Sequence, residues 1–147
     1  MSTGHVIVAA TGEFHAFADD PRKPSEGRNY SSDGHFVKKL EIYVNGSLRG
    51  TGKKAYFSTQ GCLLNHVKLE PGDREVQFRV AYGIGDVIFD EETIGPMQIL
   101  AGASLFGWFH VSGCGKYTNV YKKSYGSLDE FRQAIGVSRS EIKGKLS

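Results

Sequence analysis

The chain contains little cysteine, little net charge and no long apolar run, and each scarcity excludes a class of protein. Two cysteines among 147 residues are too few for the disulfide framework of a small secreted domain. A net charge of +2 does not by itself indicate a nucleic-acid partner. No apolar run approaches the roughly 20 residues of a transmembrane helix, and the N-terminal residues lack the basic start of a signal peptide. We therefore expect a soluble, cytoplasmic protein without a membrane partner or a cofactor.

Glycine and aromatic residues are abundant, and they favour a β fold. The 19 glycines, nine phenylalanines and seven tyrosines suit short strands joined by tight turns. Apolar and polar residues alternate over residues 35–44 and 75–82, and Asn45-Gly46 is a strong signal for a two-residue hairpin. The pattern predicts a mainly β fold, namely a single antiparallel β-sandwich or jelly roll of roughly eight to ten short strands over residues 1–126.

Three local predictions concern where these strands begin and end. Residues 11–12 are predicted to form a turn between strands over residues 5–10 and 14–18. The return strand of the hairpin is predicted to start at Ser47, to bend at glycines and to continue through residue 58. The acidic residues 90–92 are predicted to form a solvated loop.

The C-terminal segment differs from the rest of the chain in charge and in pattern. Residues 1–114 hold 11 basic and 13 acidic side chains, whereas residues 115–147 hold 7 and 3. Two capping boxes start at Ser127 and Ser138, and Gly136 is placed to end the first helix. We therefore expect a two-helix appendage over residues 127–147 that belongs to the same domain. Helices this short cannot bury a core of their own, so we favour their packing on the sheet as a cap.

The same predicted helices allow a second interpretation, in which they bind a partner and do not act as a cap. With Gly136 in the turn, Val137 and Ser138 after it and Ile142 six residues beyond the glycine, residues 131–142 resemble the helix-turn-helix signature. The resemblance implies a DNA-binding protein whose second helix enters the major groove. Carried over by position, the basic C-terminal segment would contact nucleic acid through Ser138, Arg139, Ser140 and Lys143.

Four potential metal ligands form a symmetrical pattern. Cys62 and His66 are four residues apart, and so are His110 and Cys114. Two thiolates and two imidazoles satisfy tetrahedral zinc, but residues four apart on a strand are separated by about 13 Å, so each pair would need a turn. Buried thiols and surface histidines are therefore our leading interpretation, and a zinc site is the alternative.

A second alternative is a small cysteine protease of the viral type. Ser112-Gly-Cys114-Gly resembles the sequence around the nucleophile of chymotrypsin-like cysteine proteases, and His35 and either Asp73 or Asp86 precede it in a suitable order. Only 33 residues follow Cys114, too few for the second barrel that such a cleft requires.

The leading functional interpretation is a non-catalytic binding module. Residues 40–46 and 67–80 are similar in rhythm to jelly-roll carbohydrate-binding modules, a resemblance that implies ligand recognition by loops at one end of a sandwich. The polar connection over residues 19–34 is long enough for such a loop. We therefore expect a glycan, a small molecule or a protein as the ligand, and a homo-oligomer is a further possible partner. The candidate ligand contacts are Arg28, Tyr30, His35, Tyr56 and Trp108. For Trp108, which lies between Phe106 and Phe109, we favour a place in the core.

Overall fold

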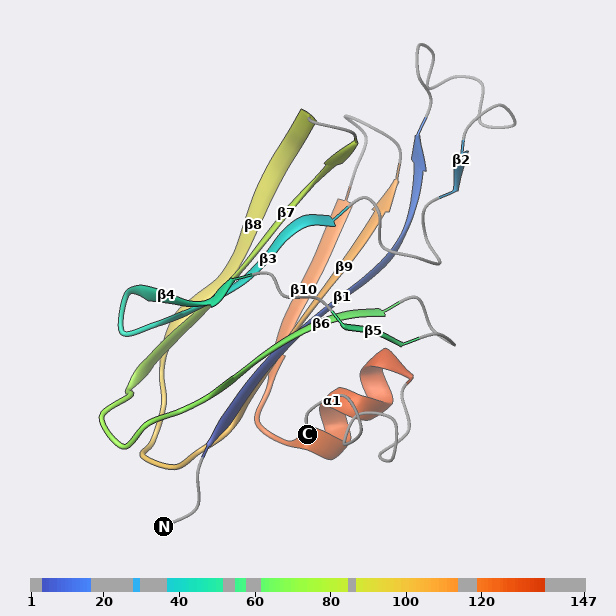
Figure 1. The fold of residues 1–147 in the computed structure, drawn as a ribbon. Coiled ribbons are helices and arrows are strands. Elements are labelled where there is room, and N and C mark those ends of the chain that lie inside the picture. The colour runs from blue at the N-terminus through green and yellow to red at the C-terminus, as the bar shows by residue number, and fades with distance from the viewer. Residues whose placement is uncertain are drawn as a thin grey trace.

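The computed structural model describes residues 4–16, 28–29, 37–51, 55–57, 62–84, 87–113 and 119–136. Within these residues the chain forms strands and one α-helix (Figure 1). In chain order they are β1 (His5–Ala16), β2 (Arg28–Asn29), β3 (Val37–Val44), β4 (Ser47–Thr51), β5 (Ala55–Phe57), β6 (Cys62–Lys68), β7 (Glu75–Ile84), β8 (Val87–Gln98), β9 (Leu105–Gly113), β10 (Asn119–Tyr125) and α1 (Leu128–Ile135).

The strands form two sheets that share one apolar core. The six-stranded sheet has the order β10-β9-β1-β6-β5, with β2 paired to β1, and the four-stranded sheet has the order β4-β3-β7-β8 (Figure 1). Val8 and Phe109 from the first sheet meet Leu40 and Phe78 from the second in a single cluster of fully buried side chains. Burying this apolar surface is the main force that holds the sheets together. The prediction of a mainly β, sandwich-like fold is confirmed.

The prediction that all strands run antiparallel was wrong at the centre of the larger sheet. β1 pairs with β9 in parallel, in a register that runs from Val6 opposite Leu105 to Phe14 opposite Gly113. Alternation along a strand indicates which residues share a face, but it does not indicate the direction of the neighbouring strand. The parallel pair also departs from the antiparallel jelly roll that the sequence suggested.

Three local predictions were also wrong, each because pairing with another strand outweighed the local sequence pattern. Residues 11–12 continue β1, since both are paired with β9. Residues 90–92 lie within β8, an edge strand opposite β7, where exposed carboxylates discourage further strand pairing. Residues 55–57 do not prolong β4 but form β5, which pairs with β6 in the other sheet. The turn at Asn45-Gly46 was correctly predicted, with both residues at positive φ.

The helix α1 is capped as predicted. The hydroxyl of Ser127 accepts a hydrogen bond from the backbone N–H of Glu130 at 3.4 Å, and Gly136 ends the helix at a φ of 73°. Phe131 and Ile135 pack on the outer face of the six-stranded sheet. We call this set of side chains the helix cluster, and its buried members are Ile7, Ala9, Leu64, Phe106, Tyr125, Phe131 and Ile135.

The predicted two-helix appendage is reduced to one helix in the part of the chain that the structure describes. The second predicted helix, with Ser138, Arg139, Ser140 and Lys143, lies outside the described residues. The first helix packs as the cap interpretation expects, because Phe131 and Ile135 are buried against the sheet.

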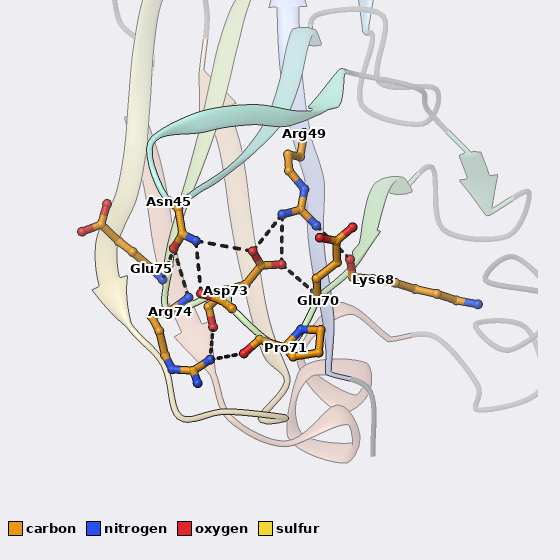
Figure 2. Close-up of polar contacts among 9 residues, drawn as sticks. Asn45, Arg49, Lys68, Glu70, Pro71, Asp73, Arg74 and Glu75 are labelled. Atoms are coloured by element: carbon orange, nitrogen blue, oxygen red, sulfur yellow. Dashed lines mark hydrogen bonds and ion pairs between the residues drawn. The ribbon is translucent and has the colours of Figure 1, made fainter. Parts of the chain in front are cut away.

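A polar network ties the β3–β4 hairpin to the connection between β6 and β7 at the edge of the sandwich (Figure 2). The carboxylate of Asp73 accepts two hydrogen bonds of 2.9 Å from the Arg49 guanidinium and one of 2.7 Å from the backbone N–H of Glu70. The Asn45 side chain accepts hydrogen bonds from the backbone N–H groups of Arg74 and Glu75. We call these groups the turn network. Because Asp73 is nearly fully buried, its charge depends on these donors for its stability.

Candidate functional site

One row of side chains crosses the outer face of the six-stranded sheet. The register places Thr11 of β1 opposite His110 of β9, and Tyr121 of β10 opposite the same His110. Residues that are directly paired across strands share a face of a sheet, so these three side chains lie side by side. Trp108 precedes His110 by two positions on β9 and therefore projects from the same face.

The indole of Trp108 is held in place by contacts on two sides. Its Nε1–H donates a hydrogen bond of 2.7 Å to the hydroxyl of Thr11. The ring of Tyr121 meets it edge-on, with 5.2 Å between centroids, and the His110 imidazole lies 5.8 Å away. Edge-to-face contacts of this kind stabilise aromatic pairs and restrict their orientation. We call Thr11, Trp108, His110 and Tyr121 the aromatic platform.

The platform lies next to the helix cluster. Trp108 packs against that cluster and is partly buried, whereas Tyr121 remains 50% exposed. Our preference for a core position of Trp108 was therefore only partly correct, because the ring lies at the border of the cluster. Lys123, opposite Trp108 on β10, holds its ammonium 5.2 Å from the Tyr125 ring centroid and adds a cation beside the platform.

The platform combines a histidine–hydroxyl pair with a fixed aromatic ring. Thr11 and His110 are 2.9 Å apart, a distance at which a histidine can activate a hydroxyl. However, the Trp108 N–H already occupies the Thr11 oxygen, and no described carboxylate bonds to His110 to orient it as a base. What remains is a pre-oriented aromatic surface with polar groups at its side.

A second histidine pair lies further along the same face. Nδ1 of His5 and Nε2 of His66 are 2.9 Å apart, while the ring centroids are 5.1 Å apart and the planes are within 23° of parallel. At this distance one of the two nitrogens can donate a hydrogen bond to the other. Burial, followed by the positive charges of His5 and Lys68, lowers the pKa of His66.

This lowered pKa predicts that acid destabilises the fold. The unfolded chain takes up a proton at His66 near the ordinary pKa of 6.5, whereas the folded protein resists it to lower pH. The free energy of unfolding should therefore be independent of His66 above pH 6.5 and should fall as the pH drops from 6.5 through the lowered pKa. Urea denaturation between about pH 5 and pH 8 measures this. The His66→Gln variant should show a shallower loss, and parallel curves for the two proteins would contradict the assignment.

The other predicted ligand contacts are not assembled by the described residues. Arg28 lies in β2 and Tyr56 in β5, where it is opposite Leu63, but their side chains are outside the described set. Tyr30 and His35 lie outside the described residues altogether. Of the five candidates, only Trp108 has a described side chain, and it belongs to the aromatic platform rather than to an end loop.

The residues of the predicted zinc site and protease site are also not brought together within the described residues. His66 is opposite Ile7 and His110 is opposite Thr11, so these histidines are four positions apart along β1, about 13 Å, and cannot share one ion. The side chain of Cys62 and all of Cys114 lie outside the described set, within which no group of three or more metal ligands occurs. Asp73, a candidate acid of a protease, is bound in the turn network.

Sequence reasoning missed Thr11 and Tyr121. Thr11 was assigned to a turn, and only its pairing with β9 places it beside His110. Tyr121 was missed because its half-exposed ring and its place beside His110 follow only from the pairing of β10 with β9.

Comparisons with known proteins assign no family to the chain. No family model matches the sequence, and no curated protein matches it. Among solved structures, the chain is similar to the membrane-binding domain of pneumolysin, with a TM-score of 0.33 and 14% identity over 85% of this chain and 99% of that one. A superposition this loose supports no inference about function. Within the described residues, no helix combines the length and apolarity needed to cross a bilayer.

Proposed function

We propose that the protein is a non-catalytic module that binds a glycan on the aromatic platform. The observation that carries the proposal is the fixed Trp108 ring, bonded to Thr11 and braced by the half-exposed Tyr121. The site therefore lies on a sheet face, in contrast to the loop site that the sequence suggested.

The chemistry of a saccharide matches this surface. One face of a pyranose ring is lined with C–H groups and packs on an aromatic ring, while its hydroxyl groups need hydrogen-bond partners at the edge. Trp108 and Tyr121 supply the aromatic surface, and His110 supplies the polar partner beside it. Because the indole is already held in position, little conformational entropy is lost when a ring stacks on it.

The single tryptophan makes the proposal directly testable. Titration with trimers of glucose, galactose, mannose and N-acetylglucosamine should change the fluorescence of Trp108 for at least one of them. By calorimetry, Tyr121→Ala should weaken that binding by about tenfold, because a half-exposed aromatic contact is lost without disturbing the core. Trp108→Ala should weaken it by at least as much.

Tyr43→Ala is the matched control for these variants. Tyr43 is an aromatic residue on the outer face of the other sheet, where it stacks under Arg79 and bonds to Glu41. Its removal should leave saccharide binding unchanged. Failure of all four trimers to bind, or equal losses in Tyr43→Ala and Tyr121→Ala, would overturn the proposal.

A further inference from the structure

We infer that Thr11 is a positioning residue that orients Trp108 and fixes His110 as a hydrogen-bond donor, so that the platform favours saccharides with an acetamido carbonyl beside the stacked ring. This inference rests on the proposed glycan-binding function, but its central element is a protonation pattern that can be measured without any ligand.

The pattern follows from the hydrogen-bonding capacity of each group. An indole N–H can only donate, so the 2.7 Å contact makes the Thr11 oxygen the acceptor. The Thr11 hydroxyl then has one hydrogen left to donate. Its other neighbour is Nδ1 of His110 at 2.9 Å, and no other acceptor for that hydrogen occurs among the described residues, so we assign Nδ1 as the acceptor.

This assignment determines the state of the other ring nitrogen of His110, Nε2. A neutral histidine that accepts at Nδ1 carries its proton on Nε2. No hydrogen bond to Nε2 of His110 occurs in the described part of the chain. The Nε2–H group is therefore a donor left for a ligand, in the same row as Tyr121 and two positions from Trp108. It can be satisfied by an acceptor such as the carbonyl oxygen of an acetamido group.

The register of the β1–β9 pair sets this arrangement of the three side chains. The parallel β1–β9 register brings Thr11 opposite His110 and diagonal to Trp108, although Thr11 is 99 residues from the first and 97 from the second. One hydroxyl thus determines the orientation of the aromatic surface and the donor character of its polar neighbour. Its removal should affect both properties together.

Two substitutions at Thr11 separate the hydroxyl from the shape of the side chain. Long-range 15N–1H correlation spectra of the free protein should show His110 protonated at Nε2 in the wild type and in Thr11→Ser, which keeps the hydroxyl. In Thr11→Val this preference should be lost, because Nδ1 no longer has a donor. Thr93→Val, on β8 of the other sheet, is the matched control and should leave the His110 spectrum unchanged.

Binding provides the second readout, with two saccharides that differ in the acceptor. The trimer of N-acetylglucosamine should bind the wild type about tenfold more tightly than the trimer of glucose, which lacks the acetamido carbonyl. Thr11→Val should abolish most of that difference, and Thr11→Ser should retain it.

The two readouts keep the proposals distinguishable. A proton on Nδ1 of His110 in the wild type, or unchanged spectra and selectivity in Thr11→Val, would overturn the role of Thr11. The expected spectra with no binding of either trimer would support the positioning role and contradict the acceptor selectivity, leaving the galactose and mannose trimers to decide the glycan proposal.

Discussion

Phe131→Ala is expected to lower the free energy of unfolding by about 3 kcal/mol, which is within the range for emptying a large buried site. The Phe131 side chain is fully buried. Its ring lies 5.4 Å from that of Phe106 and 6.2 Å from that of Tyr125. An eight-residue helix is not stable alone, so α1 depends on this contact to remain on the sheet.

Urea denaturation of the variant measures the change in free energy, and Gln133→Ala is the matched control on the exposed side of the same helix. The control should change stability by less than about 0.5 kcal/mol. Because Trp108 packs against the helix cluster, Phe131→Ala should also shift the tryptophan emission to longer wavelength. A loss of stability no larger than that of the control would show that α1 is not a structural cap.

Asp73→Ala is expected to destabilise the fold by about 3 kcal/mol, because it removes the centre of the turn network. The substitution deletes the acceptor of both Arg49 hydrogen bonds and of the Glu70 N–H. Arg49 is only 27% exposed, so its charge loses a partner in a place where water replaces it poorly. Asp73→Asn keeps the shape and one acceptor and should cost about half as much.

Glu92→Ala is the control for Asp73→Ala. Glu92 also bonds a basic side chain, Lys122, at 3.0 Å, but the two side chains are 35% and 45% exposed. Exposed ion pairs contribute little, so this variant should lose less than about 1 kcal/mol. Urea denaturation of both variants under the same conditions makes the comparison. If Asp73→Ala loses no more stability than Glu92→Ala, the turn network does not hold the β3–β4 hairpin to the β6–β7 connection.

The candidate site was only partly readable from the sequence. Trp108 was named as a candidate ligand contact because its ring could stack on a ligand, although a place in the core was favoured for it. His110 was noted for a different reason, as a possible zinc ligand, and Thr11 was placed in a turn. The three belong together because β1 and β9 run parallel, and no feature of either segment indicates that pairing.

The sequence by itself determined the features that depend on residues close together in the chain. These include the positive-φ turn at Asn45-Gly46, the Ser127 cap of α1, its end at Gly136 and the alternation that buries one face of β3 and β7. Each follows from a side chain acting on the backbone within a few positions. Only the tertiary structure decided the parallel pairing of β1 with β9 and the pairing of β5 with β6 in the six-stranded sheet. It alone also places Thr11 in contact with Trp108 and His110. Those choices depend on which distant strands bury the most apolar surface together, a property of the whole chain that no local segment carries.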